Sequence, residues 1–121
     1  MNLIAHVEIP VIDLERAMRF YAAVFGVSFG EVVTIHDNKM AYFPFEEGKD
    51  GASGALAQVD VYVPTREGAI ICLNVGDIDD LLAKAVEQGS EILFAKTPIT
   101  ENWFVAEITD SEGNRIAVQS N

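Results

Sequence analysis

The charge balance of this 121-residue chain limits its partners, because eight Lys and Arg face nineteen Asp and Glu, giving a formal net charge of -11. Nucleic acids and anionic membrane surfaces are bound by neutralising phosphates with Lys and Arg, so we expect neither as a partner. A single cysteine excludes an intrachain disulfide and suits a reducing cytoplasm, and residues 1–121 are long enough for one domain with its own core.

The first predicted element is a strand over residues 4–11, with the sequence IAHVEIPV. Side chains alternate between the two faces of a strand, and one face here is wholly apolar. We expect that face to pack against a helix, and we expect the other face, with His6 and Glu8, to line a polar space or to contact a ligand. The apolar face consists of Ala5, Val7, Ile9 and Val11.

A helix is predicted next, over residues 13–25. Asp13 is well placed as its N-cap and Gly26 as its C-terminal stop. Apolar residues recur at the 3.6-residue spacing of one helix face, so this face is expected to be buried. The apolar stripe comprises Leu14, Ala17, Met18, Tyr21, Val24 and Phe25.

Three strands complete the first half of the chain. The first two are predicted over residues 28–35 and 40–45, and the polar residues 36–39 between them have the composition of a hairpin turn. A polar loop with glycines follows, and the third strand is predicted over residues 53–63. Residues 64–68, with the sequence PTREG, form the expected junction to the second half.

The second half repeats this order of elements. Residues 9–14 align with residues 73–78 at an offset of 64, and Asp77 is the expected cap of a helix that ends at Gly89. Its buried residues are expected to be Ile78, Leu81, Leu82, Ala85 and Val86, and the strands of this half are predicted over 69–75, 91–97, 102–109 and 115–120.

The repeat predicts an α+β fold. It consists of two tandem βαβββ modules with mixed, strongly curved sheets. Module one covers about residues 1–63 and module two about residues 68–121 of the single domain.

Three segments carry a resemblance to a known family: HVEIPVIDLERAMRFYAAVFG at 6–26, LNVGDIDDLLAKAVEQG at 73–89 and FVAEITDSEGNRIAVQS at 104–120. In these segments and in its doubled module the chain resembles the vicinal oxygen chelate superfamily. This superfamily includes glyoxalase I, the fosfomycin and bleomycin resistance proteins and the extradiol dioxygenases. The resemblance implies sheets that curl into a cup around a ligand or metal, and it implies a homodimer.

The resemblance also implies positions for a metal site. Metal-dependent members place one ligand on the first strand and one on the last strand of each module. His6 fits the first position, but the offset of 64 gives Ile70 at the second, and the last-strand positions fall at Ala117 and near Leu56. Since a catalytic divalent site generally needs three protein ligands, we predict no metal and no other cofactor.

His6 and Glu8 are the leading candidates for a functional pair, because a His beside a carboxylate can act as a general acid or base. A hydrogen-bonded pair that only shapes the cup wall is an equal alternative. A displaced metal site, in which His36 or Glu107 joins His6 and Glu8, is another. Cys72 aligns with Glu8, but with no base nearby in the sequence a small packing residue is favoured over a nucleophile.

The strand over 102–109 presents Trp103 and Glu107 on one face, while its other face is apolar and is expected to meet the helices. An aromatic ring beside a carboxylate suits a flat or cationic ligand, and core packing or a dimer contact explains Trp103 equally well. On the last strand Arg115 is a candidate anion contact.

These features predict a glyoxalase/bleomycin-resistance-like protein that binds a small molecule in its cup without a metal, as a cytoplasmic homodimer. Two alternatives stay open. One is a lyase, isomerase or other enzyme of the family that uses His6 and Glu8; the other is a protein that sequesters a cationic antibiotic, although solubility alone explains an acidic surface. The candidate ligand-binding residues are His6, Glu8, Cys72, Trp103, Glu107 and Arg115.

Overall fold

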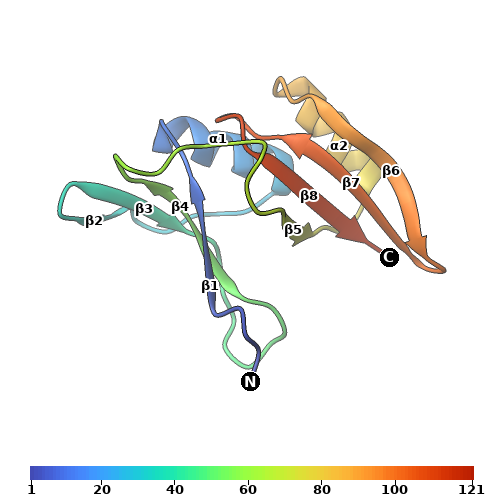
Figure 1. Ribbon diagram of the computed structural model, residues 1–121, viewed down its shortest axis with the longest axis horizontal. Coiled ribbons are helices and arrows are strands. Elements are labelled where there is room, and N and C mark those ends of the chain that lie inside the picture. Colours follow the sequence, from blue (N-terminus) through green and yellow to red (C-terminus); the bar gives the residue numbers. More distant parts are fainter.

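Both halves of the chain fold with the same order of elements, as Figure 1 shows for the computed structural model, which describes all 121 residues. Module one contains β1 (His6–Pro10), α1 (Leu14–Phe25), β2 (Val33–Ile35), β3 (Asn38–Tyr42) and β4 (Ser53–Gln58). Module two contains β5 (Ile71–Asn74), α2 (Ile78–Glu87), β6 (Ile92–Thr100), β7 (Trp103–Thr109) and β8 (Arg115–Ser120). The predicted α+β fold of two βαβββ modules is confirmed.

Each module forms its own four-stranded mixed sheet, in the orders β1-β4-β3-β2 and β5-β8-β7-β6. The first strand of each module runs parallel to the last, with Glu8 opposite Ala55 in one sheet and Cys72 opposite Ala117 in the other. The remaining pairs are antiparallel. Because β1 pairs only with β4 and β5 only with β8, each of these two strands has one open edge.

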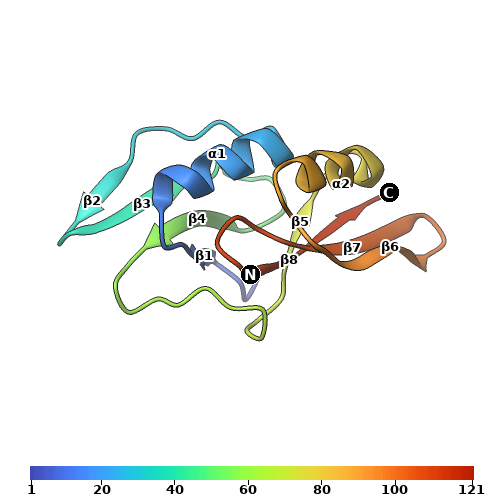
Figure 2. The same ribbon diagram turned by 90° about the horizontal axis from the view of Figure 1, so that it is seen from above.

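Both helices lie on one side of the two sheets, and the connection between β4 and β5 passes on the opposite side (Figure 2). The core lies between helices and sheets and takes one apolar face from every central strand. Phe20, outside the predicted stripe of α1, is also buried, whereas Val86 was wrongly predicted to be buried and is 53% exposed. Val86 lies about a quarter turn from the buried stripe of α2, beyond its contact with the sheet. The largest fully buried side chains are Tyr21, Ile9, Leu56, Ile78, Ile108 and Ile116.

The helix caps agree with the sequence, but several strand ends do not. The carboxylates of Asp13 and Asp77 accept from the N–H groups of Arg16 and Asp80, and Gly26 ends α1 in the left-handed region at φ 70°. The strands predicted over 28–35, 40–45 and 53–63 are shorter: they cover 33–35, 38–42 and 53–58. A strand needs a partner, and residues 28–32 leave the sheet edge, where the ring of Phe29 packs 5.4 Å from that of Phe43.

The turn between β7 and β8 ties the two modules together. The buried carboxylate of Asp110 accepts from the Tyr21 hydroxyl of α1 at 2.7 Å and from the backbone N–H groups of Glu112 and Asn114. The amide of Asn114 donates to the carbonyl of Pro10 at 2.7 Å. Burial raises the pKa of the Tyr21 hydroxyl well above its usual value, and the charge of Asp110 raises it further. Residues 110–114, with the sequence DSEGN, therefore have a structural role in holding the two modules together.

Glu112 adds further contacts between this turn and module one. Its carboxylate, fully shielded from solvent, accepts from the N–H groups of Ile12 and Asp13 at 2.9 and 2.8 Å and from the guanidinium of Arg16 at 2.8 Å. Burial alone would raise the pKa of Glu112, but these hydrogen bonds and one from Ser111 outweigh it and lower the pKa to about 2.

Neither helix combines the length and the apolar character needed to cross a bilayer.

Candidate functional site

The face of the sheets turned away from the helices carries the side chains singled out in the sequence. Ile9 and Leu56 pack in the core, so their strand neighbours in β1 and β4 point to the opposite side, which we call the open face. The same alternation puts β5, β7 and β8 side chains on the open face of the second sheet. The open face contains His6, Glu8, Cys72, Trp103, Glu107 and Arg115.

His6 is held in a polar cluster of module one. Its Nδ1 lies 2.8 Å from the hydroxyl of Ser53, which itself donates to the carbonyl of Ala5 at 3.2 Å. The tautomer of His6 decides whether Nδ1 donates to the Ser53 hydroxyl or accepts from it, and Nε2 faces the carboxylate of Glu8 at 3.5 Å. His6 and Glu8 therefore lie together, with about a third and a quarter of their side chains exposed.

Two tyrosines enclose this pair. The ring of Tyr42 lies 6.1 Å from that of His6, and the hydroxyl of Tyr62 donates to Glu8 at 3.3 Å. Tyr62 belongs to the connection that crosses the open face between the modules. Ser53, Tyr42 and Tyr62 were not predicted from the sequence as neighbours of His6 and Glu8. Ser53 is revealed only by the pairing of β1 with β4, and Tyr42 only by the pairing of β4 with β3. Tyr62 is revealed only by the course of the connection between the modules, and no sequence motif marks any of the three.

The polar groups of the second sheet satisfy one another. The guanidinium of Arg115 forms an ion pair with Glu107, and the amide of Gln119 donates to Asn74 at 2.9 Å. Partial burial raises the pKa of the Cys72 thiol, and the charge of Glu107 raises it further. The thiolate is therefore disfavoured near neutral pH. The expected packing role for Cys72 is wrong, because the residue is exposed on the open face.

Trp103 stands apart from the other open-face candidates. It is 37% exposed at the start of β7, opposite Thr100. Four residues of strand, about 13 Å, separate it from Glu107. Since Glu107 is also engaged by Arg115, the predicted aromatic seat beside a free carboxylate does not form within the chain.

A cleft of about 710 Å³ lies between the two modules, which we call the inter-module cleft. One wall comes from β1 and the loop before β4, the other from β5 and the residues before it. Eleven of its nineteen lining residues are hydrophobic, which suits an apolar ligand. Cys72 and Ser53 both line it, so His6 adjoins the cleft through Ser53. The main apolar walls are Ile4, Val7, Ile9, Phe45, Ile70 and Ile71.

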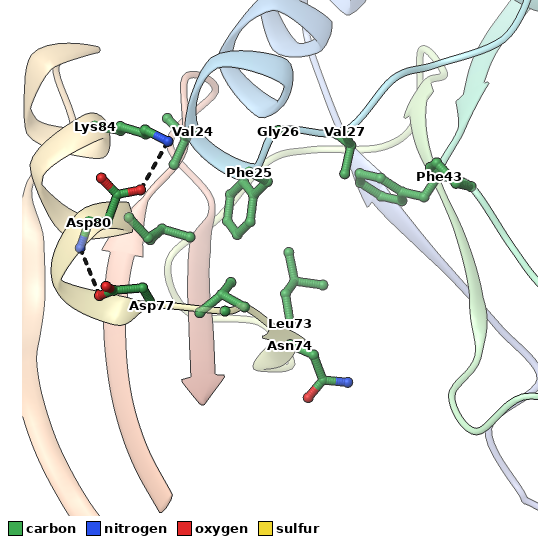
Figure 3. A pocket seen from close by; sticks show the side chains of 14 residues that line it. Val24, Phe25, Gly26, Val27, Phe43, Leu73, Asn74, Asp77, Asp80 and Lys84 are labelled. Carbon is green, nitrogen blue, oxygen red and sulfur yellow. Dashed lines mark hydrogen bonds and ion pairs between the residues drawn. The ribbon is translucent and has the colours of Figure 1, made fainter. Parts of the chain in front are cut away.

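Two further cavities border this cleft. One of about 600 Å³ shares Phe43, Pro44, Leu73 and Asn74 with it and reaches the start of α2 (Figure 3). The other, of about 160 Å³, is lined by both Glu8 and Arg115 and by the connection between the modules. The fold thus brings Glu8 and Arg115 to one small cavity although they lie 107 residues apart.

The residues present do not fit the metal site that the family resemblance implies. Leu56 points into the core, so the open-face position of β4 opposite Glu8 is Ala55, just as Ala117 stands opposite Cys72. The fourth of the family's metal-ligand positions is occupied by Ile70, so His6 is the only one of the four residues that can bind a metal ion. Nowhere in the structure do three His, Cys, Asp or Glu side chains come together in a group that could hold a metal ion.

A sequence model of the glyoxalase/bleomycin resistance protein/dioxygenase superfamily matches residues 3–118. The chain belongs to this superfamily. The resemblance found in the sequence is thereby confirmed, and it extends over both modules of this superfamily member.

Solved structures agree with this assignment. A glyoxalase family protein from Bacillus anthracis is 18% identical, with a TM-score of 0.71 over 100% of this chain and 96% of that one. Glyoxalase/bleomycin resistance proteins from Albidiferax ferrireducens T118 and Streptomyces sp. CB03234 are 17% and 22% identical, with TM-scores of 0.70 and 0.68 over 99% and 97% of this chain and 99% of each of theirs. At these identities the likeness shows the fold alone. No curated protein matches the chain.

Proposed function

We propose that this superfamily member binds a small molecule in the inter-module cleft without a metal ion. The observation that carries the proposal is the cleft itself, a mainly apolar space of about 710 Å³ whose polar lining residues are Glu46, Lys49, Asp50, Ser53 and Asn74. Its volume falls within the range of small-molecule sites. The alanines opposite Glu8 and Cys72 leave no ligand set for a cation at the family positions.

The charge of the chain narrows the ligand class. With a net charge of -11, the field around the cleft favours neutral or cationic molecules over anions. A cationic antibiotic of the bleomycin type is therefore a reasonable probe, as is a neutral aromatic compound. The homodimer and the cytoplasmic location expected from the sequence belong to the same proposal, and light scattering on the purified protein measures the oligomeric state.

An enzymatic role is the second candidate. The support for it is the orientation of His6, whose Nδ1 is fixed by Ser53 while Nε2 lies on the partly exposed side with Glu8. This arrangement leaves Nε2 as the atom that would accept or deliver a proton. The lyase or isomerase reading requires that His6→Ala abolish turnover, whereas the binding reading requires only that ligand affinity fall.

Cys72 offers a direct test of the cleft, because it is the sole cysteine and lines the cleft. We expect N-phenyl-1-naphthylamine, a neutral apolar fluorophore, to bind the protein and to be displaced by bleomycin. Labelling Cys72 with a bulky maleimide should weaken fluorophore binding by about tenfold or more, because the label fills the cleft. The Cys72→Ser variant, treated with the same reagent, should keep its affinity.

Two results would contradict the proposal. One is the absence of saturable binding of either probe up to high micromolar concentration. The other is equal fluorophore affinity in labelled and unlabelled protein. Displacement that works only after a divalent metal is added would instead support the metalloenzyme alternative.

A further inference from the structure

Each module has a junction between its first strand and its helix, and the sequence repeat makes these two junctions equivalent positions. At the offset of 64 residues, Ile12 and Asp13 in module one correspond to Gly76 and Asp77 in module two. The module-one junction is filled by the chain itself, because the carboxylate of Glu112 accepts from the N–H groups of both Ile12 and Asp13. The structure thus shows which group such a junction binds.

The module-two junction has no such group. The backbone N–H groups of Gly76 and Asp77 have no acceptor within the chain. In module one the loop over residues 43–52 connects the last two strands, as the 110–114 turn does in module two. This loop brings Phe43 and Pro44 to the cavity that Gly76 and Asp77 also line. None of its carboxylates forms a hydrogen bond to the junction.

Instead the junction opens into the cavity of about 600 Å³ shown in Figure 3. Phe25, Val27 and Phe43 of module one face Leu73 of β5 across it, while Asp80 and Lys84 stand on the α2 side. Seven of the fourteen lining residues are hydrophobic. An occupant therefore needs an apolar body as well as polar groups.

The charges at the rim differ from those of module one. Asp80 occupies the position that corresponds to Arg16, and it pairs with Lys84 at 2.9 Å. Both side chains are about half exposed, and an exposed pair of this kind is weak. A ligand that carries both charges can replace it: its carboxylate meets the two N–H groups and Lys84, and its ammonium group meets Asp80.

We propose that this cavity binds a zwitterionic molecule with an apolar side group, of the chemical class of a free aromatic or aliphatic amino acid. The carboxylate takes the place that Glu112 has in module one. The apolar group lies against Phe25, Phe43 and Leu73. This inference does not rest on the function proposed for the inter-module cleft, although the two cavities adjoin.

Amide NMR of the 15N-labelled full chain provides the test, with L-phenylalanine as the probe. We expect saturable shifts of the Gly76 and Asp77 amide signals. N-acetyl-L-phenylalanine lacks the ammonium group, and L-phenylalaninamide lacks the carboxylate. The affinity of each should be lower than that of L-phenylalanine by about tenfold or more. Asp80→Asn should weaken L-phenylalanine binding to a similar degree.

Asp79→Asn is the matched control, since it removes the same charge from the neighbouring position, where the side chain is 73% exposed and does not line the cavity. It should change the affinity less than about twofold. Absence of saturable shifts at Gly76 and Asp77, equal binding of all three compounds, or equal effects of the two variants would each overturn the inference. Because the readout is at Gly76 and Asp77, its failure is distinct from failure of the Cys72 labelling test.

Discussion

At the scale of single residues, Glu112 has the most strongly determined environment in the chain. A carboxylate without solvent contact is stable only if hydrogen bonds replace its hydration, and here two backbone N–H groups, Arg16 and Ser111 supply them. The acidic residue of the terminal motif therefore holds module two against the start of α1. It is a structural residue, not a member of a ligand site.

Replacing Glu112 by Gln should destabilise the fold by about 3 kcal/mol at pH 7, because the folded pKa of about 2 lies below the usual 4.5. A lowered folded pKa gives stability that is complete above pH 4.5 and is lost as the pH falls toward 2. Urea unfolding of wild type and variant should therefore show a difference that shrinks over this interval. Glu15→Gln, an exposed control, should cost less than about 0.5 kcal/mol. A difference that stays constant with pH would refute this assignment.

At the scale of elements, the hairpin between β2 and β3 shows what sequence patterns predict well. Polar residues 36–39 predicted a turn, and His36 and Asp37 adopt positive φ values of 50° and 67° between the paired residues Ile35 and Asn38. Two positive φ values are typical of a two-residue hairpin turn of the primed type, which favours Asn and Gly. Neither His36 nor Asp37 is the preferred residue.

Asp37→Gly should consequently stabilise the protein by about 0.5–1 kcal/mol, since glycine adopts this conformation without a steric penalty. The melting temperature should rise by about 2–4 °C. Asp60→Gly is the matched control, because Asp60 does not have positive φ, and it should not stabilise. A melting temperature that is unchanged or lower in Asp37→Gly would show that the turn is not strained.

The strand ends and the composition of the site were harder to predict for a physical reason. Alternation places His6 and Glu8 on one face of β1, but the extent of a strand depends on its partner, as the short β2 shows. The contacts of His6 with Ser53 and of Glu8 with Tyr62 join residues 47 and 54 positions apart. No local pattern encodes such pairs.

At the scale of the whole molecule, two similar modules have diverged in what fills the space between them. The module-two turn closes the junction of module one, whereas the junction of module two and the facing edges of β1 and β5 border open cavities. The doubled fold followed from the repeat in the sequence. The cavities did not, because they depend on which loop reaches which junction. This difference between the modules creates the proposed ligand sites.

The claim that the site works without a metal is tested most directly by elemental analysis of protein purified without chelator. We predict less than about a tenth of an equivalent of zinc, nickel, manganese and iron together, and fluorophore binding that is unchanged by EDTA. A full equivalent of one of these metals that is retained in His36→Ala and lost in His6→Ala would contradict it.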